Sequence, residues 1–147
     1  MREGDRVIGM VLASDDRHLL TVTANGYAKR TTMRYDQETS KGFRTRSRAG
    51  LGVIAMKVGP KTGPIVDALT VASGDELLAS TKKGMAIRCQ ADEVSEQGRN
   101  AGGVRLIRLD AEDEVVAVAH LAREETQDVP PGNTPIEPEG GATAPNP

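Results

Sequence analysis

Apolar and polar residues alternate along the chain in short runs that are separated by glycine-containing turns. The stretch LLTVTANGYAKRT, residues 19–31, places Asn25 and Gly26 between two alternating segments. Asn-Gly supplies the positive φ angles that a tight hairpin turn requires. The stretch LLASTKKGMAIRC, residues 77–89, repeats the pattern with Lys-Gly at the turn. Each stretch is therefore predicted to form a β-hairpin.

The two hairpins belong to two copies of a longer repeat. Matched residues in the hairpins are 58 positions apart, as Gly26 and Gly84 are. A second match, 51 positions apart, relates SRAGLGVIAMKV, residues 47–58, to GRNAGGVRLIRL, residues 98–109. The first copy thus carries seven additional residues, which we assign to the polar stretch 34–44. Repeats of this size are typical of architectures in which each unit buries its apolar face against a neighbour.

Further apolar runs flank each hairpin and give each repeat four predicted strands. Residues 7–13 and 65–72 precede the hairpins, and residues 52–58 and 103–109 follow them. Residues 115–122 resemble the opening strand of a third unit. No segment shows helical periodicity, so the expected class is all-β. Two four-stranded antiparallel blades of a β-propeller or a related radial arrangement are favoured.

Breaks in composition divide the chain into three parts. GPKTGP, residues 59–64, separates the first blade repeat, residues 1–63, from the second, residues 64–122, which includes the opening strand of a third. Residues 123–147 are acidic and rich in Pro and Gly, and they have little apolar surface to bury. We expect this tail to be disordered.

Charge is distributed unevenly, although the net charge is only −2. Residues 1–63 carry 12 Lys and Arg against 6 Asp and Glu, whereas residues 124–147 carry no Lys or Arg and 5 Asp and Glu. A cluster of cations is a plausible footprint for phosphates, and a solvated basic loop is the alternative. The candidate DNA-binding residues of this basic half are Lys29, Arg30, Arg34, Lys41, Arg44, Arg46, Arg48 and Lys57.

Other kinds of site have little support in the sequence. The single cysteine, Cys89, has no partner for a disulfide or a Cys-x-x-Cys motif, which suits a reducing compartment. His18 and His120 are 102 residues apart without a carboxylate pattern. No run is long and apolar enough for a signal peptide or a membrane span. We therefore expect a chain with no catalytic residue, no metal, no cofactor and no membrane partner.

Six segments lie in order along residues 5–122: DRVIGMVLA, LLTVTANGYAKRT, SRAGLGVIAMKV, KTGPIVDALTV, DELLASTKKGMAIR and EQGRNAGGVRLIRLDAEDEVVAVA. Together they resemble the C-terminal domain of the DNA gyrase A subunit. The resemblance implies a β-pinwheel, in which propeller-like blades exchange strands and double-stranded DNA wraps around a positively charged perimeter. It also implies a cytoplasmic, chromosome-associated, bacterial-type location. The other partners implied are the gyrase B subunit and the remainder of the gyrase A subunit, with ATP-driven negative supercoiling a property of the complete enzyme.

The family's defining box, Q-R-R-G-G-K-G, corresponds here to RSRAGLG, residues 46–52, and QGRNAGG, residues 97–103. By resemblance, Arg48 and Arg99 occupy positions on the DNA-binding rim, which adds Arg99 to the candidates. Tyr35 follows an arginine, as the cleavage tyrosine of type II topoisomerases does. It falls in the inserted polar stretch of a β-repeat, so we interpret it as a surface tyrosine.

The chain holds about two blades, most like the final ones of the family. It is therefore either a fragment of a longer subunit or a separate piece that works beside one. A different class of function is also compatible with the repeats: a protein-interaction module that uses open blade edges and has no DNA binding of its own.

Overall fold

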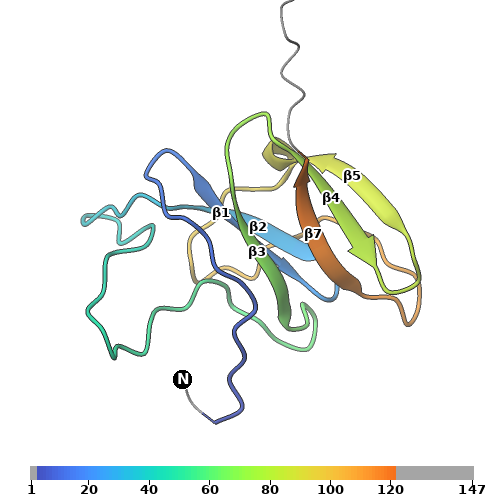
Figure 1. Cartoon of the computed structure of the whole chain (residues 1–147), viewed down its shortest axis with the longest axis horizontal. Coiled ribbons are helices and arrows are strands. Elements are labelled where there is room, and N and C mark those ends of the chain that lie inside the picture. The colour runs from blue at the N-terminus through green and yellow to red at the C-terminus, as the bar shows by residue number, and fades with distance from the viewer. Residues whose placement is uncertain (1–2, 122–147) are drawn as a thin grey trace, which may run out of the picture.

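The computed structural model describes residues 3–121, so the predicted acidic tail lies outside the described part. This part contains seven strands and one short 3-10 helix, and the prediction of an all-β fold is confirmed (Figure 1). The elements are β1 (His18–Thr23), β2 (Tyr27–Thr32), β3 (Ile65–Val71), β4 (Glu76–Thr81), β5 (Ala86–Gln90), η1 (Ala91–Glu93), β6 (Val104–Arg105) and β7 (Val115–Leu121).

The two predicted hairpins are present, and their turns have the same construction. The Gly26 amide donates to the Thr23 carbonyl oxygen at 3.0 Å, and the Gly84 amide donates to the Thr81 carbonyl oxygen at 3.0 Å. Both glycines have positive φ, at 77° and 85°. At the first turn a side chain is also excluded by space, because a Cβ on Gly26 would lie 2.6 Å from the Ile107 carbonyl oxygen.

The first sheet takes strands from both repeats. Its order is β3-β1-β2-β6, with β1 and β2 forming the first hairpin. The second repeat supplies the opening strand β3 beside β1 and the closing strand β6 beside β2. The hairpin of one repeat is therefore completed by strands of the next, which is the exchange of strands that the resemblance implied.

The second sheet repeats this pairing but has three strands, β5-β4-β7, where four were predicted. His18 of β1 lies opposite Val71, and its counterpart Glu76 of β4 lies opposite Leu121. Each pairing also has one register shift at the same place, just before Thr23 or Thr81. The fourth strand is missing because no segment of residues 3–121 takes the place beside β5 that β6 takes beside β2.

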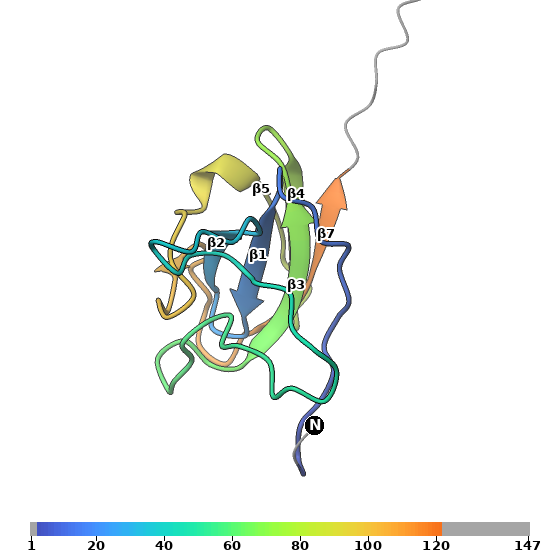
Figure 2. The same ribbon diagram turned by 90° about the vertical axis from the view of Figure 1, so that its left-hand side faces the viewer.

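Two predicted strands, residues 7–13 and 52–58, are not strands in the structure. They run outside the sheets, in the N-terminal arm and in the connection between β2 and β3 (Figure 2). Met10 is 96% exposed and Leu12 is 86% exposed. A strand requires a neighbouring backbone edge. Both edges of the first hairpin are already occupied by β3 and β6, so neither segment can pair with that hairpin.

One hydrophobic core lies between the two sheets. It is built largely of aliphatic side chains, since the chain has only three aromatic residues. The Val118 amide of β7 donates to the Asp67 carboxylate of β3 at 2.9 Å, which ties the adjacent strands of the two sheets together. The core residues are Leu20, Val22, Ala28, Val71, Leu77, Ala79, Ala91, Val94, Ile107, Val115 and Val118.

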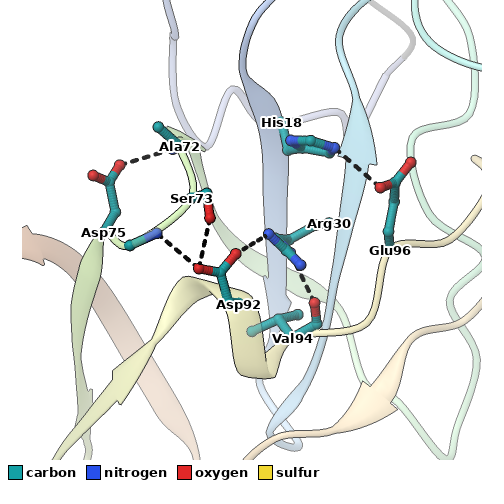
Figure 3. Close-up of polar contacts among 9 residues, drawn as sticks. His18, Arg30, Ala72, Ser73, Asp75, Asp92, Val94 and Glu96 are labelled. Carbon is teal, nitrogen blue, oxygen red and sulfur yellow. Dashed lines mark hydrogen bonds and ion pairs between the residues drawn. The ribbon is translucent and has the colours of Figure 1, made fainter.

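A polar junction centred on Arg30 also joins the repeats (Figure 3). Its guanidinium donates to the Asp92 carboxylate and to the Val94 carbonyl oxygen, both at 2.8 Å. Asp92 also accepts bonds from the Gly74 amide at 2.7 Å and the Ser73 hydroxyl at 2.9 Å, which hold the pKa of its carboxyl below the usual value. The junction thus connects β2 to η1 and to the turn between β3 and β4.

The repeat offers an internal control for the energy of this junction. Arg88 is the counterpart of Arg30, but its side chain is 66% exposed and bonds Glu76 within its own hairpin. We expect Arg30→Ala to lower the free energy of unfolding by about 2 kcal/mol, because it leaves the Val94 carbonyl group without this bond in a mostly buried place. Arg88→Ala should cost less than about 1 kcal/mol. Urea unfolding of both variants measures the difference, and equal losses would contradict the assignment.

Candidate nucleic-acid interface

The connection between β2 and β3, residues 33–64, carries most of the exposed positive charge. It contains seven Lys and Arg residues but only two acids, Asp36 and Glu38. Its first part is fixed by short-range contacts, including a bond from the Asp36 amide to the Lys41 carbonyl oxygen at 3.0 Å. Gly42 makes this tight loop possible, because it has a φ of 75° and a Cβ there would collide with the Arg34 carbonyl oxygen.

The last part of the connection is anchored against the second repeat. Met56 is 3% exposed, and the Lys57 amide donates to the Ala101 carbonyl oxygen at 3.1 Å. Gly103 packs closely between β2 and Met56, since a Cβ at Gly103 would be 2.7 Å from the Ala28 carbonyl oxygen and 2.8 Å from the Met56 side chain. These contacts place the stretch between the two anchors, residues 44–55, on the outside of the molecule.

Six of the predicted DNA-binding residues are exposed cations of this connection. None of their side chains lies within 4 Å of a carboxylate oxygen in the described part of the chain. Their charges are therefore available to an external anion. Within residues 46–52 the backbone turns at Ala49, which has a φ of 63°. The six cations are Arg34, Lys41, Arg44, Arg46, Arg48 and Lys57.

Two predicted residues, Lys29 and Arg30, do not belong to this surface. Lys29 is fully buried, and its ammonium donates to the carbonyl oxygens of Gly98 at 2.6 Å and Arg99 at 2.8 Å. The Arg30 side chain is 14% exposed and forms the junction described above. Both expectations are corrected, because these cations are bound to internal oxygen atoms. The repeat contained a signal for Lys29, since its counterpart is the apolar Ile87.

Arg99 lies at the base of the connection. Its guanidinium donates to the Ser40 carbonyl oxygen at 3.3 Å, and its Nε is buried without a hydrogen-bond partner among residues 3–121. Two residues further along the chain, the Ala101 carbonyl oxygen accepts the bond from the Lys57 amide that anchors the last part of the connection. Residues 97–103, the second copy of the box, therefore contact the connection at two places. Arg99 contacts its first loop, and Ala101 contacts its last part.

A second group of cations, which the sequence interpretation missed, surrounds the turn of the first hairpin. The Lys61 ammonium and the Arg105 guanidinium lie 5.7 and 5.5 Å from the centre of the Tyr27 ring. Arg105 and Arg108 are exposed and line a surface hollow together with Asn25. The repeat offered a signal, since Arg108 is the counterpart of the predicted residue Lys57.

The described residues also bear on the sites that the sequence did not favour. Tyr35 is partly exposed and lines a hollow with Arg34 and Lys41, as a surface tyrosine would. His18 pairs with Glu96 at 3.2 Å, and His120 pairs with Asp75 at 2.9 Å. Between residues 3 and 121, no group of three or more His, Cys, Asp and Glu residues could hold a metal ion. None of the helices described there is long and apolar enough to span a membrane.

Comparison with known sequences identifies relatives that cover most of the described residues. The family described as "DNA gyrase C-terminal domain, beta-propeller" matches residues 17–72 and 75–121. The DNA gyrase A subunit of Rickettsia prowazekii is 38% identical over 111 residues, which is 76% of this chain and 12% of that protein. The corresponding protein of Escherichia coli K12 is 37% identical over 120 residues, which is 82% of this chain and 13% of that protein. The chain thus spans about an eighth of these relatives.

Solved structures give the same result for the fold. A structure of the DNA gyrase A C-terminal domain aligns with a TM-score of 0.60 and 32% identity, covering 75% of this chain and 35% of that one. The C-terminal domain of DNA topoisomerase IV aligns with a TM-score of 0.62 at 22% identity, covering 76% of this chain and 32% of that one. These matches confirm the propeller-like class, and they do not favour the alternative of an interaction module without DNA binding.

The buried ammonium of Lys29 predicts an unusual dependence of stability on pH. Burial, and secondarily the nearby Arg99 guanidinium, lower the pKa of Lys29 from 10.5 to about 8. Between these two values the unfolded chain binds more protons than the folded chain, so this group makes the free energy of unfolding rise with pH. Urea unfolding near both ends of this window should show a larger rise for the wild type than for Lys29→Met. Parallel pH profiles would contradict the lowered pKa.

Proposed function

Because the chain belongs to the family of DNA gyrase C-terminal domains, we propose that it binds duplex DNA through the exposed cations of its β2–β3 connection. The observation that carries the proposal is the set of six exposed cations with no carboxylate within 4 Å in the described residues. Lysine and arginine side chains hold phosphates and release the counterions that surround DNA. Arg99, at the base of the connection, and the second group, Lys61, Arg105 and Arg108, extend the proposed surface.

The proposed binding does not depend on base sequence. Phosphate contacts position a protein on DNA, whereas base readout needs groups that enter a groove. The one helix of the described part, η1, has three residues and packs beside Arg30. The arginines lie on an irregular connection with exposed side chains, which suits contacts to a regular backbone of charges. Affinity should therefore depend steeply on salt and weakly on sequence.

The wider role that we propose is that of the C-terminal part of a gyrase A protein. In this role the chain holds DNA in a wrap beside the cleavage core, and the complete enzyme uses ATP to introduce negative supercoils. The partners are then double-stranded DNA, the gyrase B subunit and the remainder of the gyrase A subunit, on the chromosome in the bacterial cytoplasm. The sequence and fold of the relatives support this role. The chain itself contributes binding and geometry, and the cleavage and ATP sites belong to other parts of the enzyme.

The DNA contact can be tested by removing charge from two places in equal amounts. The variant Arg44→Ala, Arg46→Ala, Arg48→Ala removes three cations from the connection. We expect it to weaken binding to duplex DNA and to reduce the slope of log K against log salt by up to about three units. Fluorescence anisotropy between about 50 and 200 mM salt measures both quantities.

The matched control is Lys82→Ala, Lys83→Ala, Arg88→Ala, which removes three cations from the second hairpin. Lys82 and Arg88 already face the carboxylates of Glu114 and Glu76. The control should therefore change the slope much less than the first variant. Equal changes in the two variants would locate the contact elsewhere, and binding confined to one DNA sequence would contradict phosphate recognition.

A further inference from the structure

We propose that this chain also associates with itself head to tail, with residues 44–54 of one copy pairing along the open edge of β5 in a second copy. Among the described residues, the outer edge of β5 is unfilled although the equivalent edge of β2 is filled, and residues 44–54 are the repeat counterpart of the segment that fills the β2 edge. The association goes beyond the proposed DNA contact, and it can be tested without DNA.

The acceptor is the outer edge of β5. Arg88 lies opposite Leu78 of β4 in the same register as Arg30 lies opposite Leu20 of β1. In an antiparallel ladder a residue directs its N–H and C=O to the same side. The corresponding groups of Arg30 bond Ser95 and Gln97, on the side away from β1. The N–H and C=O of Arg88 therefore point away from β4, where no strand of the described residues lies.

The donor is identified by the repeat. In the first sheet, residues 95–105 follow the outer edge of β2. The Arg30 amide donates to the Ser95 carbonyl oxygen at 3.0 Å, the Gln97 amide donates to the Arg30 carbonyl oxygen at 2.8 Å, and β6 pairs further along. The counterpart in the first repeat, 51 positions earlier, is residues 44–54. This segment is in no sheet, and its apolar residues Leu51 and Ile54 are 81% and 64% exposed.

Transferring the observed register gives the expected contacts between two copies. The Arg88 amide would donate to the Arg44 carbonyl oxygen, and the Arg46 amide would donate to the Arg88 carbonyl oxygen. Thr45 would lie opposite Arg88, as Glu96 lies opposite Arg30. Side chains alternate between the two faces of a sheet, so Arg44 and Arg46 point to the face opposite that of Arg88. The register therefore avoids a direct contact between like charges across the ladder.

The repeat favours a second copy as the occupant, because its residues 44–54 are the counterpart of the segment that fills the equivalent edge of β2. The place beside β4 is already filled by β7, so the second hairpin lacks one strand and not two. A second copy offers the one segment that this edge lacks. Because donor and acceptor are different surfaces, the contact is heterologous, and further copies can add to each end.

The test uses proline to remove one amide donor from each side of the contact. Arg88→Pro removes the outward amide of β5, a position where an edge strand tolerates proline. Arg46→Pro removes the donor amide of the connection. At a salt concentration that screens repulsion between the basic connections, light scattering should show wild-type mass rising with concentration beyond one chain. Each proline variant alone should lose this association.

Mixing the two proline variants distinguishes a head-to-tail contact from any other. Arg88→Pro retains an intact residue 44–54 segment, and Arg46→Pro retains an intact β5 edge. Their mixture should therefore form a species of two chains, although neither variant associates alone. The matched controls Arg88→Ala and Arg46→Ala keep both amides and should associate as the wild type does, with thermal unfolding of every variant confirming a retained fold.

Three results would overturn the proposal. The first is a wild type that stays a single chain at all concentrations. The second is an Arg46→Pro variant that associates as the wild type does, which would indicate a symmetric pairing of β5 edges or another surface. The third is a mixture of the proline variants that stays monomeric. Arg46 lies outside the sheets, so its variant keeps the test decisive even where Arg88→Pro weakens β5.

Discussion

A two-stranded hairpin has no stable existence of its own in water, and this constraint organises the whole chain. The first hairpin becomes the centre of a four-stranded sheet because β3 and β6 pair along its two edges. Both strands come from the second repeat. The boundary near residue 63 therefore divides the sequence, whereas the first sheet extends across it. The second hairpin gains β7 by the same rule, and among residues 3–121 no strand pairs with its other edge.

The same arrangement divides the basic residues into two groups with different roles. β2 is a central strand, and its neighbours from the second repeat cover Lys29 and most of Arg30. A buried cation is tolerated only where oxygen atoms surround it, and both residues have them. The cations of the β2–β3 connection lie outside the sheets, and their charged groups are exposed to solvent. Charge counted along the sequence cannot separate these groups, because the separation depends on which strand is covered.

The sequence predicted the features that are local. Asn25 and Gly26 specify the turn, and the repeat specifies the second hairpin. Residues 7–13 and 65–71 have similar apolar patterns, yet only the latter form a strand, because the edge beside β1 holds one strand and residues 65–71 occupy it. Availability of an edge is a property of the assembled fold. The burial of Lys29 was readable in principle from its counterpart Ile87, since equivalent positions of a repeat share their direction.

Pairing of residues 44–54 with an edge would also change how their arginines meet DNA. In a strand, alternate residues are separated by about 6.6 to 6.8 Å, and Arg44 and Arg46 would then project from one face at that spacing. The phosphates of one strand of B-DNA follow one another at about 3.4 Å along the helix axis, so two arginines at this spacing can contact different phosphates of the same strand. An irregular segment must lose conformational freedom when it binds, whereas a paired one has already lost it. The two proposed interactions would therefore strengthen each other, because each orders the segment that the other uses.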